Sequence, residues 1–307
     1  MTQVTDRTDA RTRGPDGPAP EPAAVAGTDL TGAPAPAPHH GPWTIRRLAR
    51  SIWTAVRRVR HGLVVTALVV AAWWIVCALR LKSAYVLPPP DRVWTSAVAM
   101  TTSGELARHV VTSLGRVAAG FALAFALAFA VGVLAVVAPR VHAYVSPALD
   151  FLKNVPPLAL VPLLILWFGI GETPKLVVIV LTAVFPMSMG ITKGLRSCGQ
   201  DLLDVGTSLH LSPARTFWLI RLPHALPDVL VGMRVSLGYA WRALVGAEMF
   251  AAAAGLGALI VDAGNMARSD KVIVGVIAIG VVGLATDRVF ARVVRRHLRW
   301  GIDDSWR

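Results

Sequence analysis

Long apolar runs, separated by short segments that carry most of the arginines, extend over most of this 307-residue chain. Hydrophobic residues make up 54% of it and the mean hydropathy is +0.57, values far too high for an ordinary soluble domain. We therefore expect an all-α, polytopic membrane protein with about six transmembrane helices. The predicted spans are 63–79, 117–138, 155–170, 176–189, 229–254 and 272–285.

The remaining segments differ from the spans in composition. Residues 1–42 are rich in Pro, Ala and Gly and have almost no bulky apolar side chains, which predicts a disordered tail. In residues 43–62 arginines alternate with apolar residues at helical spacing, as in a basic helix that lies at the membrane surface. Residues 63–300 form the predicted transmembrane domain, with a polar loop at about 195–228, and 301–307 form a C-terminal tail.

The net charge of +13 comes from arginines that lie beside the apolar runs, both before the first and after the last. This is the positive-inside pattern, so we expect a multi-pass protein with both termini in the cytoplasm. No basic groove with interleaved aromatic residues accompanies the charge, which argues against a nucleic-acid partner. The two cysteines are too few for a structural zinc site, and we expect no metal site.

The third run is broken by residues that interrupt a helix. Pro156, Pro157 and Pro162 lack a backbone donor, and Gly169 and Gly171 end the run. Broken helices survive at membrane depth only where neighbouring helices or a water-filled cavity satisfy the freed groups. This run is therefore expected in the protein interior.

The polar loop is predicted to contain two short helices. Residues 201–211 are amphipathic, and Ser212-Pro213 is a typical start for a second helix. Pro223 and Pro227 are expected to end that helix and to begin the next span. A loop that lies on the lipid headgroups and a loop that docks a partner both fit this pattern.

The loop resembles that of permease subunits of bacterial ABC importers, whose pattern is Glu-Ala-Ala, then Gly, then Ile-x-Leu-Pro. The matching positions are Asp204, Val205, Gly206, His210, Ile220, Leu222 and Pro223. Further segments are similar to the aliphatic sulfonate, taurine and nitrate branch of that family, and the resemblance covers about residues 63–300. These segments are Pro156-Pro157 through Gly171, Ala247-Glu248-Met249 and Gly255-Leu256-Gly257, while His109, Ser113 and Arg116 look like the opening of the second span in the family as a whole.

His210 is the main departure from the family pattern. A glycine there would permit a left-handed backbone, which a residue with a side chain adopts at a cost of about 1 kcal/mol. We expect either a different docking angle of the loop or a bend taken up by Gly206.

The resemblance implies a type I importer fold like that of methionine permeases. It also implies an ATP-binding cassette subunit that docks on the loop and holds ATP and magnesium, so that no cofactor binds to this chain. A second permease copy (a homodimer), an extracytoplasmic solute-binding protein and a bacterial plasma membrane location follow as well. In agreement, the chain lacks a phosphate loop of the form G-x-x-x-x-G-K-[ST].

Five residues are candidates for the transport pathway or its gate: Glu248, Arg242, Pro162, Gly169 and Gly171. A charge within a span faces a cavity by default, so Glu248 is predicted to line or gate the pathway. Its alternative is a position near the outer interface, where it caps the turn to Gly255. Arg242 could attract an anion, or it could lie near the inner surface or be paired within a dimer.

Two other classes of function stay open at this point. An ion-gradient-driven transporter would need inverted repeats and several coupling carboxylates. An integral membrane enzyme would need a cluster of reactive polar groups. Neither feature is clear in the sequence.

Overall fold

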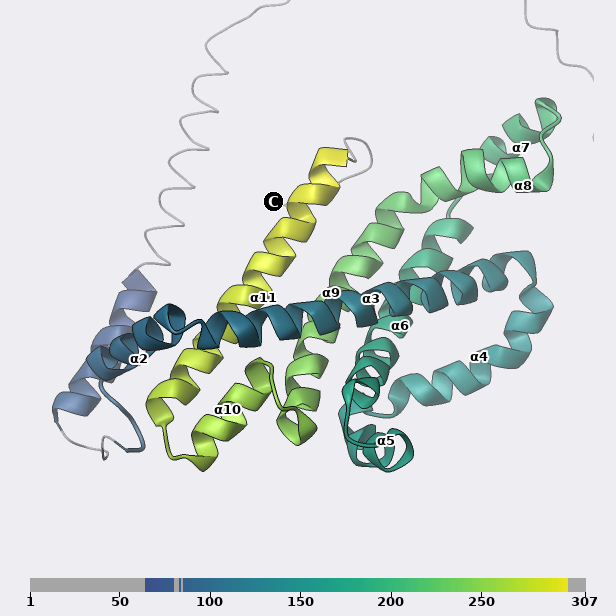
Figure 1. Ribbon diagram of the computed structural model, residues 1–307. Helices are drawn as coiled ribbons and strands as arrows, with labels where there is room; N and C mark the ends of the chain where they lie inside the picture. Colours follow the sequence, from purple (N-terminus) through teal and green to yellow (C-terminus); the bar gives the residue numbers. More distant parts are fainter. Residues whose placement is uncertain (1–63, 80–82, 84, 298–307) are drawn as a thin grey trace, which may run out of the picture. The chain divides into compact units, whose positions relative to one another are not determined.

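The computed structural model describes residues 64–79, 83 and 85–297 (Figure 1). The predictions for 1–42, 43–62 and 301–307 lie outside these residues. Within them every regular secondary-structure element is a helix, as predicted for an all-α protein. The elements are a helix at Val64–Ala78, α2 (Pro90–Thr102), α3 (Glu105–Val137), α4 (Pro139–Asn154), η1 (Pro157–Leu160), α5 (Val161–Phe168), α6 (Glu172–Arg196), α7 (Gln200–Ser208), α8 (Pro213–Thr216), η2 (Phe217–Arg221), α9 (Leu222–Ala251), α10 (Leu256–Asn265) and α11 (Ser269–His297).

In the described part of the chain, three helices are long and apolar enough to cross a membrane: α3, α6 and α11. A fourth candidate is the pair formed by α4 and the segment Pro157–Phe168, which meet at an angle of 86°. The first predicted span is only a short apolar helix, Val64–Ala78. The fifth lies in α9, where four charged residues lower the mean hydropathy. Composition alone therefore supports fewer spans than the six predicted.

The third predicted run is not one straight helix. Pro156 and Pro157 separate α4 from a short 3-10 turn, and α5 then ends at Gly169, which has a positive φ of 74°. The break that the prolines predict is therefore present. Its sharp angle fits either a broken span or a re-entrant segment.

The core lies where α3, α6 and α9 pack together. One apolar cluster joins α2, α3, α6, α9, α10 and α11, and a second joins α3, α6 and α9. Backbones approach closely at glycines, since a Cβ added to Gly190 of α6 would lie 2.8 Å from Cα of Gly232 in α9. Small residues of this kind let helices associate in lipid, where burial alone gives no drive.

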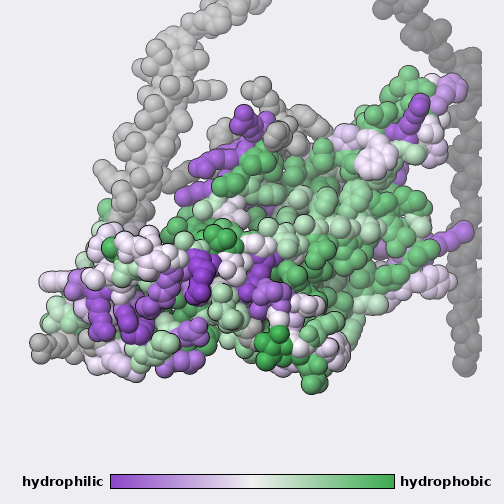
Figure 2. Space-filling model, viewed as in Figure 1, coloured by the Kyte–Doolittle hydropathy of each residue, from purple (hydrophilic) through white to green (hydrophobic). Residues whose placement is uncertain are grey.

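The surface agrees with a membrane environment. Apolar side chains cover the middle of the face seen in Figure 2, and hydrophilic ones gather towards its ends. Many large apolar side chains of the long helices are exposed, among them Leu123 at 55% and Val281 at 60%. Such extensive apolar exposure is expected of a protein whose solvent is lipid.

Candidate coupling loop and transport pathway

The polar loop between α6 and α9 is shorter than predicted. It runs over residues 197–221, because α6 continues to Arg196 and α9 already begins at Leu222. The prediction that Pro223 and Pro227 end a helix is wrong. Pro223 lies in the first turn of α9, directly after the π-helical turn, and Pro227 lies inside α9. The loop therefore continues without a break into the membrane helix.

Each turn of the loop is held by local hydrogen bonds. Ser212 caps α8 by accepting a hydrogen bond from the backbone N–H of Arg215 at 3.4 Å. The π-helical turn Phe217–Arg221 then leads into α9. In Figure 1, α7 and α8 lie together at one end of α6 and α9.

His210 adopts the backbone conformation that the family pattern assigns to glycine. Its φ is 54°, in the left-handed region. Its N–H donates to the carbonyl of Thr207 at 2.9 Å, and the next N–H, of Leu211, donates to the carbonyl of Gly206 at 3.0 Å. These two bonds form a Schellman motif, the usual helix end in which glycine is preferred. The turn is thus kept with a non-glycine residue, so the expectation that Gly206 takes up the bend is not met.

Gly206 has a different role, which is close packing. It is buried within α7, and an added Cβ would lie 3.0 Å from Cδ1 of Ile220 and 3.1 Å from Cγ2 of Thr216. The absence of a side chain at Gly206 therefore lets α7 rest directly on the segment that leads into α9.

The other predicted loop residues divide into an exposed group and a packed group. Asp204 is exposed and accepts a hydrogen bond from Nε2 of Gln200 at 3.0 Å, and Val205 is 52% exposed. Leu222 and Pro223 lie half-buried in the first turn of α9. Further large apolar side chains are exposed on the loop: Leu202, Leu209, Trp218 and Leu219.

The two helices that flank the loop are closely joined to each other. Besides Gly190 and Gly232, an added Cβ at Gly194 would lie 2.7 Å from the carbonyl oxygen of Ala225. Near the same place, Nζ of Lys193 pairs with Oδ1 of Asp228 at 2.8 Å. A force applied to the loop would therefore act on α6 and α9 as a pair.

Glu248 lies in the interior, with an exposed fraction of 1%. Its Oε1 accepts from Nη1 of Arg116 at 2.7 Å and from Oγ of Ser113 at 2.8 Å, and its Oε2 accepts from the N–H of Gly257 at 2.9 Å. Arg116 also pairs with Glu172 in the first turn of α6. One carboxylate therefore joins α3, α9 and α10 directly, and α6 through Arg116.

The start of α10 is capped by side chains from two other helices. The consecutive N–H groups of Leu256 and Gly257 donate to Ser113 Oγ and Glu248 Oε2, both at 2.9 Å, and His109 Nδ1 lies 2.9 Å from the carbonyl oxygen and 3.1 Å from the nitrogen of Gly255. The first N–H groups of a helix have no partner within it, and a negative charge there is favourable. Of the two roles considered for Glu248, its hydrogen bond to the N–H of Gly257 fits a cap of the turn that begins at Gly255. A role as a gate of the pathway stays a prediction.

Sequence reasoning did not assign the α3 side chains that contact Glu248 and the start of α10. His109, Ser113 and Arg116 are spaced four and three residues apart, which places them on one face of α3. This row of polar residues beside a predicted span was the feature of the sequence that could have indicated these contacts.

The remaining pathway candidates lie apart from Glu248. Pro162 and Gly169 are exposed, at the start and the end of α5, and Gly171 precedes α6 with an extended backbone. The large apolar residues around them are exposed too, with Leu166 at 79%, Trp167 at 65% and Ile170 at 82%. The described chain therefore leaves this irregular segment uncovered.

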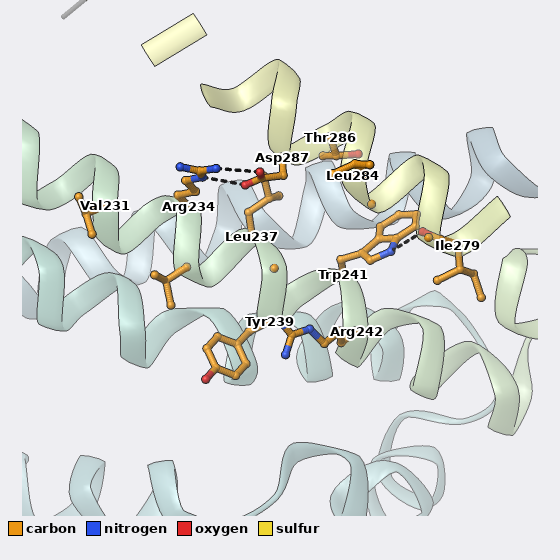
Figure 3. Close-up of a pocket in the computed structure, with 14 residues that line it drawn as sticks. Val231, Arg234, Leu237, Tyr239, Trp241, Arg242, Ile279, Leu284, Thr286 and Asp287 are labelled. Atoms are coloured by element: carbon orange, nitrogen blue, oxygen red, sulfur yellow. Dashed lines mark hydrogen bonds and ion pairs between the residues drawn. The ribbon is translucent and has the colours of Figure 1, made fainter. Parts of the chain in front are cut away.

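Arg242 lines an open cleft of about 870 Å³ between α9 and α11 (Figure 3). In the same cleft Arg234 pairs with Asp287 through two bonds, Nε to Oδ1 at 2.8 Å and Nη2 to Oδ2 at 2.9 Å. Arg242 is exposed, and its guanidinium carbon lies 5.4 Å from the centre of the Tyr239 ring. Figure 3 shows Tyr239 and Arg242 pointing away from the Arg234–Asp287 pair.

Comparison with known proteins places this arrangement in a family. Residues 128–299, more than half of the chain, match the family described as the inner membrane component of binding-protein-dependent transport systems. The chain belongs to this family. It is a permease subunit of an ABC transporter, a transport protein and not an enzyme.

Relatives of the permease are similar over most of their length. The putative aliphatic sulfonates transport permease SsuC of Bacillus subtilis is 37% identical over 78% of this chain and 87% of its own. The taurine permease TauC of Escherichia coli is 32% identical over 81% and 92%. The bicarbonate permease CmpB of Synechocystis is 34% identical over 67% and 78%.

The fold of the permease is also found in a solved structure. An inward-facing structure of the MetNI methionine ABC transporter matches with a TM-score of 0.50 at 19% identity, over 61% of this chain and 95% of that one. The predicted methionine-permease-like, type I importer fold is therefore confirmed.

Proposed function

We propose that the permease imports a small oxyanion across the bacterial plasma membrane, driven by a separate ATP-binding cassette subunit that docks on the polar loop. The proposal is based mainly on the structure of this loop. It exposes apolar side chains such as Val205 and Leu209 on a short helix whose turn is fixed by hydrogen bonds. Exposed apolar side chains on an ordered polar element are typical of a docking surface.

The same geometry supports a route for the motion. Gly206 seats α7 on the segment that continues into α9, and α9 is in close backbone contact with α6. A displacement of the loop by the ATPase would therefore move both membrane helices together. In this proposal Asp204, Val205, Gly206 and His210 form the docked part, while Ile220, Leu222 and Pro223 connect it to α9.

A second copy of the permease would cover the segment around α5. Irregular backbone at membrane depth is tolerated only where it is buried in protein or lines a water-filled cavity. Pro162 and Gly169 are left uncovered by the described chain, as are Leu166 and Ile170, and Gly171 is half-buried. We therefore place the transport pathway between two copies, with α5 at their contact.

The substrate class and the other partners follow from the relatives. Their names specify aliphatic sulfonates, taurine and bicarbonate, and nitrate has the same chemistry, a compact group of oxygens with a negative charge. A solute-binding protein would deliver this anion to the outer face. ATP and magnesium would be held by the ATPase, with no cofactor in this chain and both termini in the cytoplasm.

Transport by the reconstituted complex tests the proposal. Liposomes that contain the permease, the ATPase and the binding protein are expected to accumulate methanesulfonate, taurine or nitrate only when ATP is supplied. An ionophore that removes ion gradients should leave the uptake unchanged. Uptake that continues without ATP and stops with the ionophore would disprove ATP-driven import.

A loop variant tests the docking surface separately. Val205→Arg places a charge on the exposed apolar face and should reduce both ATPase binding and ATP-driven uptake at least tenfold. Thr102→Arg, a change at an exposed position of α2, is the control and should bind the ATPase like the wild type. If the wild type, Val205→Arg and Thr102→Arg all bind the ATPase equally well, the docking surface lies elsewhere.

A further inference from the structure

The cleft between α9 and α11 contains one arginine that is neutralised and one that is not. Arg234 is paired bidentately with Asp287. No carboxylate of the described residues pairs with Arg242, which instead stacks against the ring of Tyr239. Since the charged residues that line the cleft are these two arginines and one aspartate, its lining has a net charge of +1.

Arg242 does not lie at an end of its helix. At 1.5 Å per residue it is about 30 Å along α9 from Leu222 and about 13 Å before the last residue, Ala251. The neighbours that share its exposed face are mostly apolar, with Val231 and Val235 each 46% exposed. An arginine within an apolar span marks a water-filled cavity or a ligand pathway by default, because lipid does not solvate its charge.

The geometry of Arg242 suits an anionic group with several oxygens. A guanidinium presents its N–H groups as a planar fork that can bind two oxygens of a sulfonate, nitrate or carboxylate at once. Contact with the Tyr239 ring orients this plane without satisfying those donors. Gly238 lies beside the guanidinium, since an added Cβ there would be in ordinary contact, 3.9 Å, with Nη2 of Arg242.

We propose that Arg242 binds the oxyanion group of the transported substrate as the substrate passes the exposed face of α9, on the side away from the Arg234–Asp287 pair, and that Tyr239 positions the guanidinium. This inference rests on the proposed import of an oxyanion and adds a recognition site within the permease itself. The positive charge of Arg242 matches the single negative charge of a sulfonate or nitrate group, which taurine also carries beside its ammonium group.

Binding to the purified full-length permease tests the site without transport. Methanesulfonate, taurine and nitrate are the probes, in detergent and in phosphatidylcholine nanodiscs. Arg242→Gln should weaken binding at least tenfold, and Arg242→Lys should recover part of it because the charge is kept. Arg292→Gln removes an exposed arginine of α11 outside the cleft and should bind like the wild type.

Uptake by the reconstituted complex gives the second measurement. Arg242→Gln should lower the uptake of methanesulfonate at least tenfold, while ATPase activity stimulated by the binding protein stays within twofold of the wild type. A loss of uptake in both Arg242 variants together with a lower melting temperature would mean a structural role and would overturn the inference.

The remaining outcomes separate this inference from the proposed function. If ATP-driven uptake of an oxyanion is normal in Arg242→Gln, the site is disproved and the importer function stands. If the wild-type permease binds none of the three probes, the site is disproved whatever the transport assay shows. An effect of Arg242→Gln that requires anionic lipid would identify a lipid headgroup as the ligand, which also overturns the proposal.

Discussion

At the scale of single residues, Glu248 shows how a carboxylate inside a membrane protein can hold helices together. Its oxygens are used by Ser113, Arg116 and the N–H of Gly257, so the charge is neutralised and hydrogen-bonded inside the protein. Removing one partner of a buried ion pair leaves the other uncompensated, which typically costs about 3–5 kcal/mol.

Truncation of Glu248 should therefore destabilise the folded permease. We expect Glu248→Ala to lower the free energy of unfolding by about 3 kcal/mol, the low end of this range, because Arg116 keeps Glu172 as a partner. Glu248→Gln should lower it less, because the amide oxygen still accepts hydrogen bonds. Thermal unfolding of the purified protein measures both. Asp150→Asn, which breaks the exposed pair with Lys153, is the control and should cost less than about 1 kcal/mol. A melting temperature unchanged in Glu248→Ala would refute the packing role.

His210 offers a stabilising substitution. Because its φ of 54° is favourable for glycine, His210→Gly should stabilise α7 by about 1 kcal/mol. Thr207→Gly, in the exposed part of the same helix, should instead destabilise it by about 0.3 kcal/mol. Hydrogen exchange of the α7 amides distinguishes the two, and slower exchange in the wild type than in His210→Gly would contradict the expectation.

At the scale of elements, the contact between α6 and α9 depends on glycine. Gly190→Ala should destabilise the permease by about 2 kcal/mol or more, because the added methyl group would meet the backbone of Gly232, which cannot move aside. Gly115→Ala in α3 is the matched control, since nothing lies within 4 Å of its added Cβ, and it should be neutral or stabilising. Thermal unfolding tests this contrast, and an equal effect of the two changes would count against the close contact.

The elements themselves were largely predictable, but their ends were not. The apolar runs located α3, α6 and α11, and the prolines located the break before α5. The start of α9 was missed because proline is tolerated in the first turn of a helix, so that Pro223 marks a beginning as readily as an end. In α7, the spacing of apolar residues could not show that the helix ends at Ser208 with His210 in a left-handed conformation.

At the scale of the whole molecule, the uncovered α5 segment predicts association of two copies. Ile170→Lys places a charge at a side chain that is 82% exposed and should shift the purified permease from dimer to monomer. Val111→Lys, at a side chain of α3 that is 68% exposed, is the control and should leave the dimer intact. Light scattering of the detergent-solubilised protein measures the mass, and dimers in both variants would place the contact elsewhere.

The sequence by itself determined that this chain is helical and lies in a membrane, because hydropathy and backbone satisfaction in lipid depend on composition along the chain. Its motifs also pointed to the permease family, since the loop and the broken third run have local patterns. Only the tertiary structure decided which charges neutralise one another. Arg116 and Glu248 are 132 positions apart, and Arg234 and Asp287 are 53 apart. No local pattern couples such residues, so these ion pairs, and the absence of a carboxylate partner for Arg242 among the described residues, follow from how the helices pack.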